Sequence, residues 1–260
     1  MVHHDFFVGW RTDRRNRKIA NQGKEEVVTV TVPIKISVYR ERISMNKEWS
    51  ELNKTMQMQI KSRNSFRNGI MTLLLLREKL IGQIAEFENT LTKEQMCAIP
   101  FIHAEGYHNK TIAYSLYHIF RIEDIVAHTV IAKDEQVFFA GNYKSRMHSP
   151  IITTGNELVK QEIADFSKEL DLSELYQYVY DVNKATSELL KQVTFDDLKK
   201  KYTEQDKETV RTLGVVSEDE KAVWLIDYWC NKDLKGLIQM PFSRHWIMHI
   251  EASLRIRNKV

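Results

Sequence analysis

The chain has 260 residues, which is long enough to bury a substantial core in one large domain or two small ones. Its share of hydrophobic residues, 43%, and of charged residues, 28%, is ordinary for a globular protein and excludes a disordered chain. The 38 basic residues outnumber the 35 acidic ones by too little to indicate a nucleic-acid partner.

The cysteines and the apolar runs indicate a reducing compartment and no membrane. Cys97 and Cys230 are too few and too isolated for a disulfide framework or a cysteine metal cluster. No apolar run reaches the length of a membrane span, and the N-terminus lacks the apolar core of a signal peptide. We therefore expect a cytoplasmic protein that binds neither a membrane nor nucleic acid.

The first 44 residues differ in character from the rest of the chain. Valine and isoleucine alternate with mostly polar residues from Val28 to Val38, which predicts a strand, and Pro33 places that strand at a sheet edge. A lone strand is not stable in water, so residues 1–44 either add to an unseen partner or form a loose extension. A second interpretation is that Met45 is the natural start. In either case we expect residues 45–260 to form the folded domain.

From Met45 onward the apolar residues recur at helical spacing, and few glycines and prolines interrupt the chain, which predicts an all-α domain. In chain order, the expected helices are residues 45–56, 66–89, 109 or 111 to 132, 158–170, 172–190, 195–202, 223–229 and 234–256. In the last of these, Pro241 either kinks a long helix or starts a new one. We expect a loop at residues 141–155. The strongly charged stretch 194–220 is expected to be a solvated excursion apart from its one short helix. The long helices make a bundle the natural architecture.

Two of these helices carry histidines that could bind a metal together. His245 and His249 lie four residues apart on the last helix, so their imidazoles project from one face and can reach one ion. His118 lies in the middle of the helix 109–132 and could supply a third ligand. Spacing alone is weak evidence, because histidines are more often hydrogen-bonded core residues or surface residues than ligands. Their apolar neighbours indicate that at least one imidazole faces the interior and needs a partner there.

Two motifs around these histidines resemble a known family. The segment Tyr114-Ser-Leu-Tyr-His-Ile-Phe-Arg-Ile-Glu-Asp-Ile resembles the second-helix signature of the DinB/YfiT-like superfamily, and Met240-Pro-Phe-Ser-Arg-His-Trp-Ile-Met-His resembles the His-x-x-x-His of its final helix. The resemblance spans residues 45–258 and implies a four-helix-bundle metalloprotein, here with accessory short helices. It assigns the metal to His118, His245 and His249. The strand-like extension and the charged insertion around residues 194–220 depart from the family pattern.

The resemblance also implies a chemistry for the metal centre. Three neutral imidazoles leave a divalent ion its full charge and one open position, which is typical of catalytic sites. Zinc or nickel is the expected transition metal, with iron or manganese as alternatives. Such an ion acidifies bound water and holds a thiol as thiolate. Because characterised relatives include thiol-dependent S-transferases, we expect a small-molecule substrate and a low-molecular-weight thiol.

The roles of the neighbouring polar residues, and the choice between an enzyme and a binding protein, stay open at this point. Tyr114, Tyr117, Arg121 and Asp124 share the helix of His118 and are candidates for orienting ligands or substrate, although packing or ion pairing is the more common role for each. The alternative function is a non-catalytic stress-response or metal-binding protein whose helical bundle serves for dimerisation. A homodimer is expected from the resemblance alone.

Overall fold

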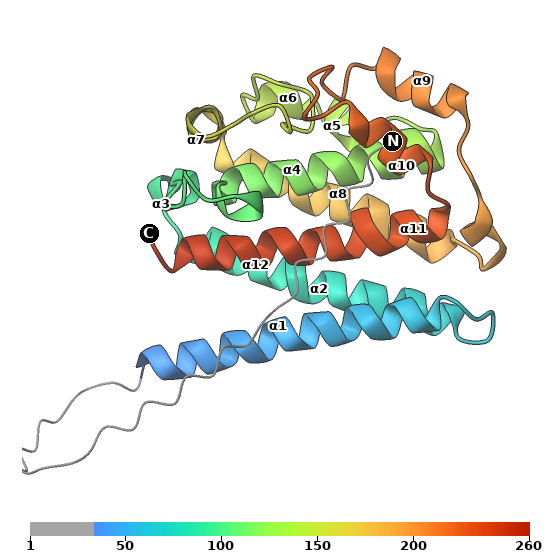
Figure 1. The fold of residues 1–260 in the computed structure, drawn as a ribbon, viewed down its shortest axis with the longest axis horizontal. Helices are drawn as coiled ribbons and strands as arrows, with labels where there is room; N and C mark the ends of the chain where they lie inside the picture. The colour runs from blue at the N-terminus through green and yellow to red at the C-terminus, as the bar shows by residue number, and fades with distance from the viewer. Residues whose placement is uncertain (1–33) are drawn as a thin grey trace, which may run out of the picture. The chain divides into compact units, whose positions relative to one another are not determined.

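The computed structural model describes residues 34–260, with side chains from residue 46 onward. Residues Glu41–Val260 form one compact unit. Residues 34–260 are mostly helical and contain no strand (Figure 1). The expectation of an all-α domain is therefore confirmed for this range. No helix within it is both long and apolar enough to span a bilayer.

The strand predicted for Val28 to Val38 is wrong in its second half. Residues 28–33 lie outside the described part of the chain, whereas Ile34 begins α1 (Ile34–Gln59), which continues past the expected boundary at residue 44. Alternation over so few residues is compatible with either structure. Extending an existing helix adds one hydrogen bond for each residue fixed, while a lone strand has no neighbour to bond. The helix is favoured for that reason.

Helices α1 and α2 (Phe66–Thr90) are joined by a tight turn at residues 60–65. A Cβ at Gly69 would lie 2.5 Å from the side chain of Ile60, so only glycine allows this approach. The apolar stripe of α2 is buried, as its helical spacing predicts. The expected end of this helix near Asn89 agrees with the structure.

The helix that carries His118 is buried on all sides. α4 (Ile112–Asp124) begins after Thr111, whose side-chain oxygen accepts a hydrogen bond from the backbone N–H of Tyr114 at 2.9 Å. Every residue of α4 is buried, as expected for a helix that other helices surround. It continues into a π-helical segment, η2 (Ile125–Ala132), so the predicted helix start at Thr111 and end at about Ala132 agree with the structure.

The helical stretch expected over residues 234–256 is continuous but changes its pitch at Pro241. α11 (Leu234–Gln239) leads into a π-helical segment, η4 (Met240–Arg244), and then into α12 (His245–Arg257). Pro241 lies at the start of η4, where its missing N–H is tolerated. Because a π turn holds more residues than an α turn, η4 offsets the face of α12 from that of α11.

Four long helices enclose a common core. α8 (Leu172–Gln192) packs against α2 and α4, and α12 packs against the same two helices. Side chains from all four helices lie in one buried apolar cluster that includes Leu80, Phe120, Val179 and Ile250. Figure 1 shows α4 and α12 running alongside each other. This packing brings the helix of His118 next to the helix of His245 and His249.

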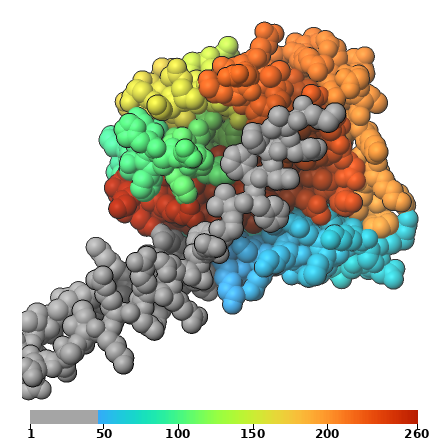
Figure 2. Space-filling model, viewed as in Figure 1, coloured from blue at the N-terminus to red at the C-terminus, as the bar shows by residue number. Residues whose placement is uncertain are grey.

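Shorter helices cover this core. They are α3 (Lys93–Cys97), η1 (Gly106–His108), α5 (Val137–Ala140), α6 (Tyr143–Arg146), α7 (Gln161–Glu169), η3 (Asp196–Lys199), α9 (Glu204–Thr212) and α10 (Trp224–Cys230). Two expectations are corrected here, because α6 interrupts the loop predicted at 141–155 and α9 lies within the stretch 194–220 predicted to be solvated. α9 begins with a capping box between Thr203 and Asp206 and buries Val210. In Figure 2, α9 (orange) lies at the upper edge of the described surface and α2 (cyan) at the lower edge.

Candidate metal centre

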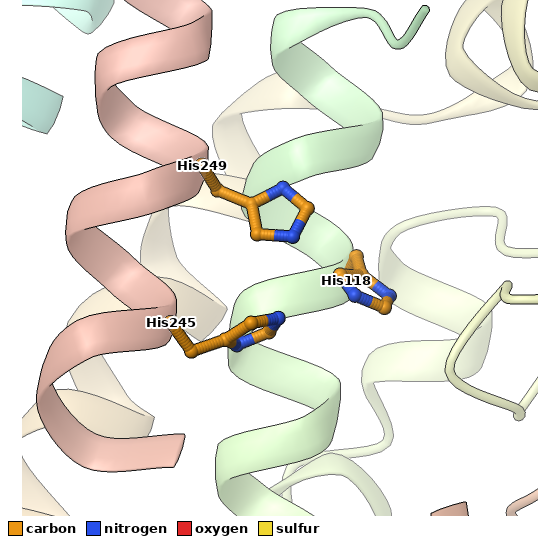
Figure 3. A group of neighbouring side chains, drawn as sticks. All are labelled: His118, His245 and His249. Carbon is orange, nitrogen blue, oxygen red and sulfur yellow. The ribbon is translucent and has the colours of Figure 1, made fainter. Parts of the chain in front are cut away.

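Three histidines from two helices converge in the interior. His118 projects from α4, and His245 and His249 project from successive turns of α12, so the three rings point toward one another (Figure 3). The atoms that could bind a metal all lie within 4.8 Å of one another. The side chains are 6%, 7% and 2% exposed in that order, so water does not solvate them freely. This buried group could hold one metal ion.

The tautomer of His118 follows from its hydrogen bond. Nδ1 of His118 lies 2.8 Å from the backbone carbonyl oxygen of Thr154. A carbonyl can only accept, so Nδ1 carries the proton and donates, and Nε2 keeps its lone pair for a metal. A carbonyl partner of this kind is what fixes the ring of a metal-binding histidine.

The other two histidines have ring nitrogens that no group in the described part of the chain satisfies. Nδ1 of His245 and both ring nitrogens of His249 are buried without a hydrogen-bond partner. A buried polar atom left unpaired costs about 1–3 kcal/mol, so such atoms are uncommon. A metal ion shared with His118 would give one nitrogen of each ring the partner that it lacks. The donor set therefore fits a divalent transition metal.

The surroundings keep all three imidazoles neutral, which is the form that binds metal. Burial lowers the pKa of His118 to about 4, against the weaker opposing effect of the Thr154 carbonyl. Burial also lowers the pKa of His245 and His249 well below the usual range, and the neighbouring histidines lower it further. No proton therefore competes with a metal at neutral pH.

Three of the four candidate residues on α4 fasten the loop that holds His118. The hydroxyl of Tyr114 donates to the carbonyl of Gly155 at 2.9 Å, and its ring stacks on His118 at a centroid distance of 5.6 Å. The hydroxyl of Tyr117 lies 3.1 Å from the carbonyls of Ile151 and Thr153. The guanidinium of Arg121 donates to the carbonyl of Ile152 at 2.7 Å. These bonds position the Thr154 carbonyl against the imidazole.

Asp124, the fourth candidate, lies in a buried polar network that it shares with Arg121. Its carboxylate accepts hydrogen bonds from the backbone N–H groups of Val137 and Phe138, each at 2.9 Å, and from Arg121 at 3.2 Å. The hydroxyl of Tyr178 donates to it at 2.8 Å. Asp124 therefore joins α4 to α5 and α8, and it anchors Arg121, which fastens the loop that holds His118.

A second buried network fixes how α12 faces α4. The indole N–H of Trp246, between the two α12 histidines in sequence, donates to Glu123 at 2.8 Å. Arg77 of α2 binds both carboxylate oxygens of Glu123, at 2.7 and 2.9 Å, and lies over the indole ring at 4.3 Å. Rotation of α12 about its axis would break these bonds. The network therefore holds His245 and His249 toward His118.

A pocket of about 240 Å³ opens beside His118 and His245. The other residues that line it are Tyr107, Ile122, Asn156, Trp224, Leu225, Tyr228, Trp229, Met240 and Pro241. Sequence reasoning did not find these lining residues as a site, because they come from segments far apart in the chain. Only the dense aromatic stretch around Trp224 and Tyr228 was a usable signal.

Lys110 is a further residue near the centre that the sequence did not single out. Its ammonium lies 5.3 Å from the centre of the Tyr114 ring and lowers the pKa of both His118 and His249. Burial lowers the pKa of Lys110 itself. Among the described residues no carboxylate forms an ion pair with it. Lys110 therefore adds a positive charge near the three histidines.

No protein-family model matches the chain, and no curated protein does. The three histidines, the groups that hold them and the adjacent pocket are therefore the observations from which a function can be inferred. They define a buried site with three neutral nitrogen ligands and an apolar approach.

Proposed function

We propose that the chain is a metalloenzyme of the DinB/YfiT-like superfamily that holds one divalent ion on His118, His245 and His249. The observation that carries this proposal is the set of buried imidazole nitrogens without partners, which lie together beside a pocket. Three protein ligands leave a further position open, as in catalytic rather than structural centres. Zinc and nickel suit such ligands, and iron or manganese are the alternatives.

The packing of the helices supports the family assignment. In this proposal α2, α4, α8 and α12 are the four helices of the bundle, since each packs against two of the others. α4 and α12 carry the two motifs in the order that the family has. α1 and α9 would then be additions outside that bundle.

The residues of the chain would orient the ligands and exclude water. When bound, a divalent ion would supply positive charge that stabilises a thiolate and polarises an electrophile. The Thr154 carbonyl keeps Nε2 of His118 free to bind, and Trp246 holds α12 in register through Glu123. Burial of the three histidines keeps their environment apolar, which strengthens any charge interaction there.

The charge balance of the site favours an anionic co-substrate. The three ligands are neutral, and no carboxylate is among the described residues that line the adjacent pocket. A divalent ion would leave two positive charges in a buried setting, which is costly unless an anion accompanies them. A thiolate meets this need, and the family resemblance favours it over hydroxide. In the proposed reaction the thiol sulfur forms a bond to a carbon electrophile as its leaving group departs, and the thiol proton passes to solvent.

Elemental analysis tests the metal centre. Tag-free protein purified without added metal should contain about one transition-metal ion per chain. His118→Ala and His249→Ala should both lose it, while His103→Ala, which removes an exposed histidine outside the site, should retain it. Protein that holds no metal even after reconstitution with zinc, nickel, iron and manganese would refute the proposal.

A second assay separates the enzyme from the alternative. The metal-loaded protein is incubated with 1-chloro-2,4-dinitrobenzene and either glutathione or cysteine, and release of chloride is followed. A rate that requires thiol and metal, and that is lost in His249→Ala but not in His103→Ala, is expected. Metal-loaded protein that consumes no electrophile with any thiol would favour a non-catalytic metal-binding protein, whose dimerisation can be measured by sedimentation equilibrium.

A further inference from the structure

The pocket beside His118 and His245 has aromatic walls and one polar amide. Its volume of about 240 Å³ is at the small end of ligand pockets and accommodates a bicyclic ring system. We infer that it binds the substrate through an uncharged, planar aromatic group that carries a hydrogen-bond acceptor. This inference rests on the proposed function, because it names the substrate class of that same site.

The aromatic side chains at the pocket are placed to contact a flat ring. Trp224 and Tyr228 meet edge to face, with ring centroids 5.5 Å apart and planes at 76°. Tyr107 approaches from η1 and meets His249 edge-on at 4.8 Å. Trp224 is 49% exposed and Tyr107 is 39% exposed, which is high for large apolar rings. Exposed rings gathered around a pocket indicate a binding surface for an apolar ligand.

Asn156 gives the pocket a directed hydrogen-bond donor. The hydroxyl of Thr154 donates to Oδ1 of Asn156 at 2.8 Å, so the oxygen side of the amide is engaged. The NH₂ side has no hydrogen-bond partner among the described residues, and Asn156 lines the pocket. It can therefore donate to a carbonyl or nitro oxygen of a ligand. Thr154 also holds His118 through its carbonyl, so this donor lies at a fixed place relative to the metal ligands.

The residues that line the pocket offer no ion-pair partner to a charged group on a ligand. None of the residues around the pocket is an acid, a lysine or an arginine. Burial raises the pKa of Tyr228, so its phenol stays protonated and neutral. Two cations lie near Tyr228 without lining the pocket: the Lys232 ammonium, 3.9 Å from the ring centre, and the Arg244 guanidinium, whose charge opposes the effect of burial on the pKa of Tyr228. A carboxylate or ammonium on the ring would lose its hydration without gaining an ion-pair partner there.

Binding of three related probes to the full-length metal-free protein tests this inference. The probes are 2-naphthamide, its charged analogue 2-naphthoate, and the non-planar cyclohexanecarboxamide. Titrations followed by tryptophan fluorescence and by ligand-detected NMR should show saturable binding of 2-naphthamide. The other two should bind about tenfold more weakly, because one introduces a buried charge and the other cannot stack on the rings.

Two substitutions locate the probe. Trp224→Ala should weaken 2-naphthamide binding by about tenfold through loss of the aromatic wall. Asn156→Asp keeps the oxygen that accepts from Thr154 but replaces the donor by an acceptor, and should weaken binding by a similar factor of about ten. Leu75→Ala, at an exposed apolar residue of α2 that does not line the pocket, is the matched control and should bind as the unaltered chain does. Melting temperatures would verify that all three variants fold.

The outcomes distinguish this inference from the proposed function. Absence of saturable 2-naphthamide binding, or equal binding by Trp224→Ala, would overturn the aromatic pocket even in a chain that binds metal. Preference for 2-naphthoate in the metal-free protein would overturn the requirement for an uncharged group. Specific 2-naphthamide binding by a chain that takes up no metal would support the pocket while refuting the metalloenzyme.

Discussion

Replacement of His249 by leucine should stabilise the metal-free protein, although His249 lies 2% exposed in the core. Neither of its ring nitrogens has a hydrogen-bond partner. Removing two unpaired buried polar atoms should gain about 1–3 kcal/mol for each, less about 0.5–1.5 kcal/mol for the lost edge-on contact with Tyr107. Allowing for imperfect packing of leucine, we expect a net gain of about 1–3 kcal/mol in the free energy of unfolding.

The order of stability should reverse when metal is present. Zinc at a thousand times its dissociation constant would stabilise the unaltered chain by about 4 kcal/mol. His249→Leu lacks one of the three ligands and should gain little from the same zinc concentration. Urea unfolding followed by circular dichroism, once with EDTA and once with zinc, measures both differences.

His118→Leu is the matched control for this reasoning, because it also removes a ligand. Its Nδ1 donates to the Thr154 carbonyl, which the substitution would leave buried and unpaired. We therefore expect a loss of about 1–3 kcal/mol in EDTA, opposite in sign to the effect of His249→Leu. Equal destabilisation by the two substitutions in EDTA would refute the argument from unpaired nitrogens.

Three further predictions concern pH, the register of α12 and the charge beside the site. Burial lowers the pKa of His118 to about 4, whereas an imidazole in the unfolded chain takes up a proton near pH 6.5. The metal-free protein should therefore lose stability as the pH falls from about 6.5 to about 4. In urea unfolding, this loss should exceed that of His118→Leu by about 1.4 kcal/mol per pH unit. Trp246→Phe removes the N–H that donates to Glu123 together with part of the buried ring beneath Arg77. It should cost about 1–3 kcal/mol and weaken zinc binding, whereas unchanged zinc affinity would show that the register does not depend on this bond. Lys110→Met removes a cation near the ligands, and should tighten zinc binding by about three- to tenfold in a competition titration with a chelator, more at low salt than at high salt.

The sequence predicted the helices that a periodic pattern of apolar residues within their own segment defines. α2 and α8 have apolar stripes at helical spacing, so their existence and approximate ends could be read directly. The spacing of His245 and His249 indicated a shared face, and the structure brings both together with His118. His118 was a candidate third ligand from its place in the middle of an apolar helix, and the family resemblance assigned it, since helical spacing does not relate residues on different helices.

The elements that the sequence missed depend on contacts between distant segments. α9 is rich in charged residues and has one buried apolar position, Val210, together with the buried cap residue Asp206, so its pattern resembles a solvated stretch. The alternation after Val28 predicted a strand because periodicity does not reveal whether a neighbouring strand exists. The role of Asn156 depends on the loop that Tyr117 and Arg121 fasten. No pattern along the chain marks such a loop as part of a site.

The wide separation of α4 and α12 along the chain also bears on how the protein is made. During synthesis α4 emerges from the ribosome long before α12, while every residue of α4 needs a buried environment. Until α12 arrives, His118 has no second imidazole beside it, and the apolar surface that α12 later covers is open to aggregation. A nascent chain released before α12 should therefore depend on chaperones, and uptake of the ion should be among the last events of its maturation.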